Sequence, residues 1–291
     1  MRDFIIATDS DTEIPYTYAD QYGIPVFLMP YTVNGEERLF DLGRNTDFVS
    51  FYEELSNGAD AITSTRPPVD IADFFREAVK SGKDVLYLSF SSALSGHFDL
   101  AQMAKNMVLE ELPDARIEIV DTLRISMGAG QLVMQAQQLK NEGKSIEEIR
   151  DWVIANRQRS QAWFSVDDLN YLKKGGRLSG AAAAIGTILD VKPILKLNRE
   201  GKIVAADKVK GTKKILRFFL NVIQENVENA EEQTAYVLHA NCLETAEKLK
   251  ELLVETVPFK DVQIQDIGPV IGCHTGPGAL AVIFMGKEMT S

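Results

Sequence analysis

Short apolar runs alternate with helical patterns through the first half of the sequence, and this alternation limits the possible folds more than any other feature. Residues 4–7, 84–90 and 117–120 are typical of buried strands. Helices are expected after Pro15 and over residues 69–81, 95–110, 124–142 and 145–158. Strands separated by helices of this length pair in parallel, because each helix returns the chain to the same end of the sheet. We therefore predict an α/β domain with a parallel sheet.

The pattern changes near residue 160. Further strands are expected at residues 162–166, 203–208, 235–239, 262–267 and 279–285, with helices near 211–228 and 243–256. A length of 291 residues is typical of about two domains. The sequence predicts an N-terminal parallel-sheet α/β domain over residues 1–160 and a second, smaller α+β domain over residues 161–291.

Charge and composition disfavour several classes of protein. The net charge of −11 disfavours nucleic acid as a partner. No apolar stretch approaches the roughly 20 residues that span a bilayer, and the N-terminal residues enter a strand pattern without the apolar segment of a signal peptide. The two cysteines are expected to be buried thiols. These features predict a cytoplasmic protein.

Positive charge is concentrated between Lys173 and Arg217, where twelve basic residues accompany three acidic ones. A segment of this kind is usually a solvated face. The alternative is a docking surface for an acidic or phosphate-bearing partner.

Hydroxyl side chains gather where the predicted parallel strands end, which is where ligands bind in open parallel sheets. Ser91, Ser92 and Ser95 follow the strand near Phe90, and the run Thr63-Ser64-Thr65 precedes a helix. Ser95 stands where a helix cap is expected, and capping alone would explain it. One cap needs only one hydroxyl, so the cluster also predicts a cradle for an anion such as a carboxylate.

His274 lies in a glycine-rich segment that we expect to be a turn before a strand. A lone histidine is more often structural than ligand-binding, but glycines on both sides favour a fixed backbone that presents the imidazole. His97, near a helix start, and His239, at a strand end, are expected to be structural. Asp9 is expected to accept a backbone hydrogen bond within its own turn rather than to act as an acid.

Common enzyme motifs are absent from the sequence. It has no G-x-S-x-G nucleophile elbow, no G-x-x-x-x-G-K-[ST] phosphate loop and no G-x-G-x-x-G dinucleotide turn. The scattered histidines and cysteines lack zinc-ligand spacing, so no metal site is predicted. Hydroxyls without an evident general base favour binding over turnover. The alternative is a hydrolase or phosphotransferase that uses Ser95 and His274.

Five segments in order along the chain resemble the motifs of the DegV family, bacterial fatty-acid carriers of which some are the binding subunit of fatty acid kinase. The resemblance covers almost the whole chain, from Asp9 to Phe284. The family's T-D-S-x-x-x-x-P opening stands at residues 8–15, T-T-S-Q-P at 63–67, S-S-x-L-S-G-T at 91–97, L-x-Y-L-x-x-G-G-R at 169–177 and H-T-G-P-G-A at 274–279.

This resemblance implies a non-catalytic protein that encloses one long-chain fatty acid and needs no cofactor. The carboxylate would be held by Thr65, Ser95 and His274, with Thr63, Ser64 and Ser92 beside them. The implied partner is an ATP-dependent fatty acid kinase subunit, which makes an acyl phosphate for phospholipid synthesis. The segment from Lys173 to Arg217 is the expected docking surface for that subunit, and transient contact with a membrane is also compatible with a carrier.

The sequence departs from the family pattern at several positions. Arg66 replaces the usual glutamine, Pro68 the usual serine, and His97 the usual threonine. Arg66 could form a two-pronged ion pair with a carboxylate, but we expect it to point to solvent. Lys208 and Lys210 stand where many relatives carry an arginine, and lysine is a poorer planar clamp for phosphate or carboxylate.

Overall fold

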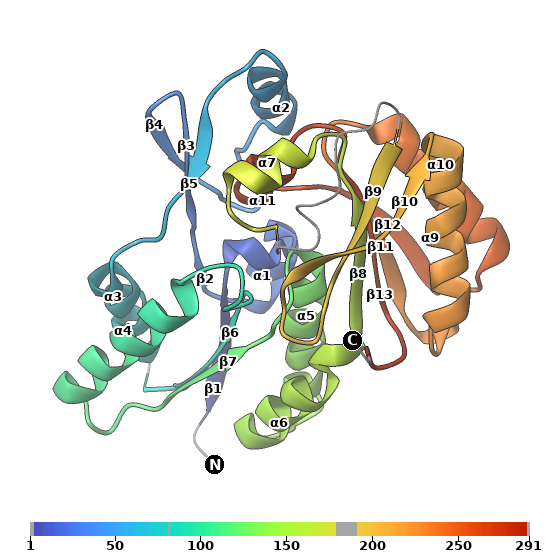
Figure 1. Ribbon diagram of the computed structural model, residues 1–291. Helices are drawn as coiled ribbons and strands as arrows, with labels where there is room; N and C mark the ends of the chain where they lie inside the picture. The colour runs from blue at the N-terminus through green and yellow to red at the C-terminus, as the bar shows by residue number, and fades with distance from the viewer. Residues whose placement is uncertain (1–2, 81, 179–190, 290–291) are drawn as a thin grey trace. The chain divides into compact units, whose positions relative to one another are not determined.

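A computed structural model describes residues 3–80, 82–178 and 191–289 (Figure 1). The chain divides into two compact units. Residues 1–32, 37–46 and 63–157 form the first unit, and residues 33–36, 47–62 and 158–291 form the second.

The first unit is built on a four-stranded parallel sheet in the order β2-β1-β6-β7. In this sheet Ala7 lies opposite Tyr87, and Asp9 lies opposite Phe27. Because successive strand residues point to opposite faces, Leu86 and Leu88 pack with one group of helices and Tyr87 faces the other. The strands are β1 (Phe4–Asp9), β2 (Val26–Phe27), β6 (Asp84–Ser89) and β7 (Ile117–Asp121).

Helices cover both faces of this sheet (Figure 1). One face packs against α1 (Tyr16–Tyr22), α5 (Met127–Asn141) and α6 (Ile146–Asn156), and the other against α3 (Pro68–Val79) and α4 (His97–Glu111). Helix α6 begins at the expected capping box, in which Ser145 and Glu148 each bond the other's backbone N–H. Helix α3 begins with Pro68 in its first turn, where a missing N–H does no harm.

The second unit contains a six-stranded mixed sheet in the order β10-β9-β8-β13-β11-β12. Only β11 and β12 pair in parallel among these strands, and α10 connects them. Phe219, Leu249 and Phe284 are fully buried in the core between the helices and this sheet. The elements are β8 (Ser160–Ser165), β9 (Val191–Leu197), β10 (Ile203–Lys210), α9 (Thr212–Asn226), β11 (Thr234–His239), α10 (Leu243–Thr256), β12 (Asp261–Asp266) and β13 (Leu280–Met285).

Shorter elements complete the described chain. A small sheet has the order β4-β3-β5. The elements are β3 (Pro30–Val33), β4 (Glu36–Leu39), β5 (Ala61–Thr63), α2 (Phe48–Ser56), α7 (Leu169–Lys174), α11 (Pro269–Thr275) and the 3-10 turns η1 (Ser10–Thr12), η2 (Arg157–Arg159) and η3 (Ala230–Glu232). Helix α11 corrects one expectation, because the segment around His274 is helical up to Thr275 rather than an irregular turn.

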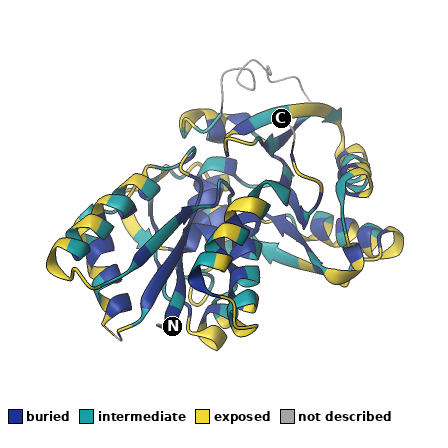
Figure 2. Ribbon diagram, turned by 90° about the horizontal axis from the view of Figure 1, so that it is seen from below, coloured by how far each residue is buried: buried dark blue, intermediate teal, exposed yellow. Residues whose placement is uncertain are grey.

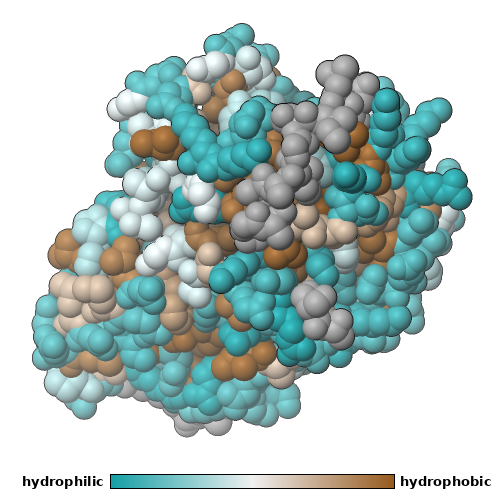
Figure 3. All heavy atoms as spheres, viewed as in Figure 1, coloured by the Kyte–Doolittle hydropathy of each residue, from teal (hydrophilic) through white to brown (hydrophobic). Residues whose placement is uncertain are grey.

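The fold is of the predicted α/β class, with a parallel four-stranded sheet and a mixed-sheet unit. Figure 2 shows the strand beside the N-terminus as buried and the outer helix faces as exposed. On the face drawn in Figure 3, hydrophobic side chains form separate patches among hydrophilic ones. Among the described residues, no helix has the length and apolar character needed to cross a bilayer.

Candidate functional site

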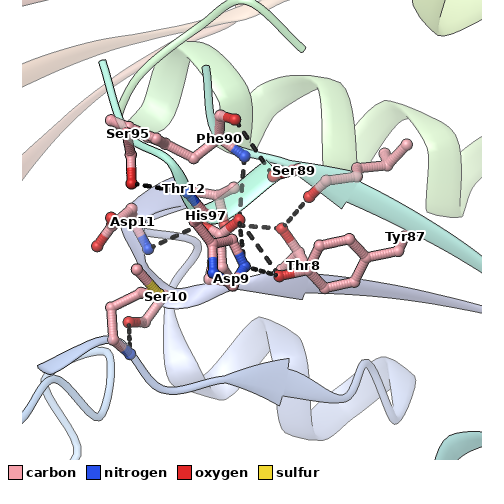
Figure 4. Close-up of polar contacts among 12 residues, drawn as sticks. Thr8, Asp9, Ser10, Asp11, Thr12, Tyr87, Ser89, Phe90, Ser95 and His97 are labelled. Atoms are coloured by element: carbon pink, nitrogen blue, oxygen red, sulfur yellow. Dashed lines mark hydrogen bonds and ion pairs between the residues drawn. The ribbon is translucent and has the colours of Figure 1, made fainter. Parts of the chain in front are cut away.

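Asp9 lies at the carboxyl end of β1 and is completely buried. Its Oδ2 atom accepts a hydrogen bond from the Phe90 N–H at 3.0 Å, and its Oδ1 atom accepts one from the Asp11 N–H at 3.2 Å (Figure 4). Burial raises the pKa of the Asp9 carboxyl to about 7, although these hydrogen bonds act to lower it. The bond to Asp11 is the structural role predicted for Asp9.

Tyr87 and His97 extend this buried cluster (Figure 4). The Tyr87 hydroxyl lies 2.7 Å from His97 Nε2 and 3.4 Å from Asp9 Oδ2. Burial lowers the pKa of His97 to about 4, so the imidazole is neutral at pH 7. The expected structural character of His97 agrees with this environment. Tyr87 was not singled out in the sequence, because only the strand register brings it beside Asp9.

The Ser95 turn connects β6 to α4. The half-buried Ser95 Oγ accepts a hydrogen bond from the His97 N–H at 3.2 Å, while Gly96 occupies the N-cap position. Ser95 therefore accepts from the first amide of the helix. A residue at the N-cap position would instead accept from the second or third amide. Ser92 is exposed, and its N–H donates to Asp121 Oδ1 at 3.2 Å.

The second hydroxyl segment ends β5 and leads into α3. Thr63 is half-buried, whereas Ser64 and Thr65 are exposed. The Arg66 side chain is 37% exposed, and its Nε and Nη2 atoms lie 2.8 and 2.7 Å from Asp70 Oδ2 in the first turn of α3. The guanidinium thus has a protein carboxylate as its partner.

His274 belongs to the second unit, in the last turn of α11. A Cβ atom added at Gly175 would lie only 2.1 Å from His274 Nδ1, so the imidazole rests against glycine backbone. Arg177 donates a hydrogen bond to the Gly175 carbonyl. Burial and, to a smaller extent, the charge of Arg177 lower the pKa of His274 to about 4. The neutral ring therefore offers one N–H donor at pH 7.

The segment after His274 also contacts the segment around residues 167–177. A Cβ at Gly276, which has a φ of 70°, would lie 2.4 Å from the Tyr171 ring. At Gly278 it would lie 2.5 Å from Asp167 Cγ. Within the second unit, two distant sequence motifs thus pack on one another, and glycine is needed where they meet.

The structure distributes the six candidate residues over both units. Thr63, Ser64, Thr65, Ser92 and Ser95 belong to the first unit, and His274 belongs to the second. A single site formed by all of them remains a proposal. In the described part of the chain, no group of three or more His, Cys, Asp or Glu side chains is arranged to hold a metal ion. Within the described residues neither Cys242 nor Cys273 forms a disulfide; Cys273 is buried and Cys242 is half-buried.

Comparison with known proteins assigns the chain to a family. The family model described as "Uncharacterised protein, DegV family" matches residues 3–287. A DegV domain-containing protein of Clostridium perfringens is 40% identical over 286 residues, which are 98% of both chains. This chain therefore belongs to the DegV family.

Two solved structures are similar over almost the full length. A DegV family protein from Thermus thermophilus, described by its fatty acid binding, has a TM-score of 0.86 and 30% identity, covering 99% of this chain and 100% of that one. DegV from Bacillus subtilis, described as a fatty acid binding protein, has a TM-score of 0.83, 30% identity and the same coverage.

The close approach at Gly175 predicts the effect of a Gly175→Ala substitution. The added methyl group should displace the His274 ring and lower the free energy of unfolding by about 1–3 kcal/mol. A displaced, better solvated ring should titrate closer to its ordinary pKa of 6.5, and an NMR titration of the histidines would measure this. Asn170→Ala, an exposed change in α7, the helix that ends just before Gly175, is the control. An unchanged His274 pKa in Gly175→Ala would contradict the prediction.

Because the His97 imidazole is buried, we predict that the free energy of unfolding falls as the pH is lowered. The unfolded chain binds a proton at this residue as the pH falls below 6.5, whereas the folded chain does so only near pH 4. The contribution is complete above pH 6.5 and is lost towards pH 4, amounting to about 3 kcal/mol. Asp9 acts in the opposite sense, because its raised pKa favours the folded state at low pH and this contribution is lost as the pH rises from 3.8 to 7.

The difference between wild type and His97→Thr isolates the histidine contribution. Urea unfolding at pH 4 to 7 should show a profile that is flatter in acid for His97→Thr than for the wild type. Asn106→Ala, at an exposed position of the same helix, should keep the wild-type profile. Parallel profiles for wild type and His97→Thr would rule out a buried neutral His97.

Proposed function

We propose that this protein is a non-catalytic carrier that encloses one long-chain fatty acid. The observation that carries this proposal is the similarity, over almost the whole chain at 30% identity, to two DegV structures described as binding fatty acids. A carrier of this kind must gain enough free energy from burying the acyl chain to remove it from water. Burying a chain of about 15 methylenes is worth on the order of 12 kcal/mol. A bilayer offers a similar gain per methylene, so a carrier competes with the membrane on equal terms.

In this proposal, Thr65, Ser95 and His274 hold the carboxylate, with Thr63, Ser64 and Ser92 nearby. Burying a carboxylate costs several kcal/mol unless hydrogen bonds replace its water. Two hydroxyls and one imidazole N–H supply three donors. Burial lowers the pKa of His274 to about 4 in the protein without ligand, and the neutral imidazole has one N–H that can donate to the carboxylate.

The environment of Ser95 favours binding over hydrolysis. A nucleophilic serine needs a base within hydrogen-bond reach of its hydroxyl. Within the first unit, the neighbouring His97 imidazole is bonded to Tyr87 instead, and Ser95 Oγ accepts from the His97 backbone N–H. His274, the base that the hydrolase alternative would use, belongs to the second unit. This geometry supports a hydroxyl that donates its proton to a ligand.

The carboxylate assignment predicts that Thr65→Ala and Ser95→Ala each weaken fatty-acid binding about 10- to 100-fold, because each removes a hydrogen bond to a charged group. Denaturing extraction of the purified proteins followed by mass spectrometry would measure bound lipid. Ser50→Ala, at an exposed position, should match the wild type.

Three outcomes of this experiment separate the possibilities. Full lipid occupancy in both alanine variants would overturn the site assignment. An empty wild-type protein that also takes up no added palmitate would overturn the carrier proposal. Ester hydrolysis that is lost in Ser95→Ala would favour the hydrolase.

We further propose that a fatty acid kinase subunit docks on the basic segment between Lys173 and Arg217. Residues 179–190 of this segment lie outside the described structure. Several described basic side chains around β10 and the start of α9 are exposed, which supports electrostatic recognition of an acidic partner. They are Lys202, Lys208, Lys210, Lys213, Lys214 and Arg217.

Charge reversal tests this docking surface. The double variant Lys208→Glu, Lys210→Glu should lower acyl-phosphate formation by the ATP-dependent subunit about tenfold or more at low salt, with no change in fatty-acid content. The double variant Lys248→Glu, Lys260→Glu reverses two exposed lysines elsewhere in the second unit, changes the net charge by the same amount and is the control for charge alone. Equal rates for all three proteins would contradict docking at β10.

A further inference from the structure

A cluster of contacting side chains, Phe27, Arg66 and His97, links the two hydroxyl-bearing segments of the first unit. Its centre is Phe27, which is 5% exposed and lies at the end of β2. The His97 ring stacks on Phe27, with ring centroids 5.3 Å apart and an interplanar angle of 24°. The Arg66 guanidinium lies 5.8 Å from the Phe27 centroid. All three residues belong to the same unit.

Arg66 and His97 are each held by a second contact. Arg66 is paired with Asp70 in the first turn of α3. His97 Nε2 lies 2.7 Å from the Tyr87 hydroxyl, and its ring is 1% exposed. Phe74 of α3 contacts Phe27 edge-on, at 5.6 Å between centroids. Cation–π attraction and ring stacking therefore act on a phenylalanine that has little room to move.

Arg66 and His97 are each linked to one of the proposed ligand residues. Thr65 directly precedes Arg66, and Ser95 bonds the backbone N–H of His97. A shift of Phe27 would thus be transmitted to the loop before α3 and to the turn before α4. Hydrogen bonds to a carboxylate depend on donor positions within a few tenths of an ångström.

We propose that Phe27, in contact with both Arg66 and His97, sets the spacing of Thr65 and Ser95, and that Arg66 and His97 are positioning residues for the head group. This inference rests on the proposed fatty-acid function. It gives Arg66 and His97 a joint role in the head-group site.

Binding of palmitate and of methyl palmitate would test the proposal. The ester keeps the acyl chain but lacks the negative charge of the head group. Arg66→Gln, His97→Thr and Phe27→Leu should each weaken palmitate binding about tenfold and leave methyl palmitate binding unchanged. In the Phe27→Leu background, Arg66→Gln and His97→Thr should have no further effect, because the contacts with the Phe27 ring are already lost.

A matched control exists at the other end of the same sheet. Phe4, at the start of β1, is 6% exposed and has the Lys140 ammonium 5.3 Å from its ring centroid. Phe4→Leu and Lys140→Gln break a similar cation–ring contact far along the strand from the hydroxyl segments. Both variants should bind palmitate as the wild type does. Should Phe27→Leu fail to fold, Arg66→Gln and its double variant with His97→Thr provide the same cycle.

The outcomes distinguish this inference from the proposed function. A wild-type protein that binds neither compound overturns both. Wild-type palmitate binding with unchanged affinity in Arg66→Gln and His97→Thr overturns only the positioning role. Equal losses for palmitate and methyl palmitate also overturn it, because they indicate a change in the acyl-chain pocket rather than in the head-group loops.

Discussion

The buried carboxyl group of Asp9 determines how the end of the parallel sheet is built. A buried carboxylate costs several kcal/mol unless hydrogen bonds replace its water. In this protein the replacing donors are the N–H groups of Phe90 and Asp11, which bind the end of β6 and the first turn after β1 to the same side chain. Tyr87 then joins Asp9 to His97, at the first residue of α4. These hydrogen bonds fix the two ends of the Ser95 turn.

Long amphipathic elements could be predicted from the sequence, because their periodic burial is visible in the residue order. Helix α10 (Leu243–Thr256) was expected over the same residues, and strand β12 (Asp261–Asp266) within one residue. Of two helices of equal length, α1 was expected after Pro15, whereas α11 was missed for a physical reason. In α11 a proline and two flanking glycines indicate a turn, yet proline at a helix start and glycine after its end are also the signals of a short helix.

The candidate residues could be named from motifs, but their surroundings could not. The contact of Tyr87 with Asp9 depends on strand register, which the sequence leaves open. The ion pair of Arg66 with Asp70 depends on how the chain enters α3, because Arg66 precedes the N-cap residue Pro67 and lies outside the helix. The stacking of His97 on Phe27 joins residues 70 positions apart in the chain, with no periodic signal to indicate it.

The glycine backbone against His274 has a consequence for the entropy of ligand binding. A histidine side chain on an open surface samples several rotamers, and a ligand must select one of them. Contact with Gly175 leaves the ring little rotational freedom before any ligand arrives. The side-chain entropy is then lost when the protein folds and not when a ligand binds. An imidazole arranged in this way contributes nearly the full strength of its hydrogen bond to whatever group it meets.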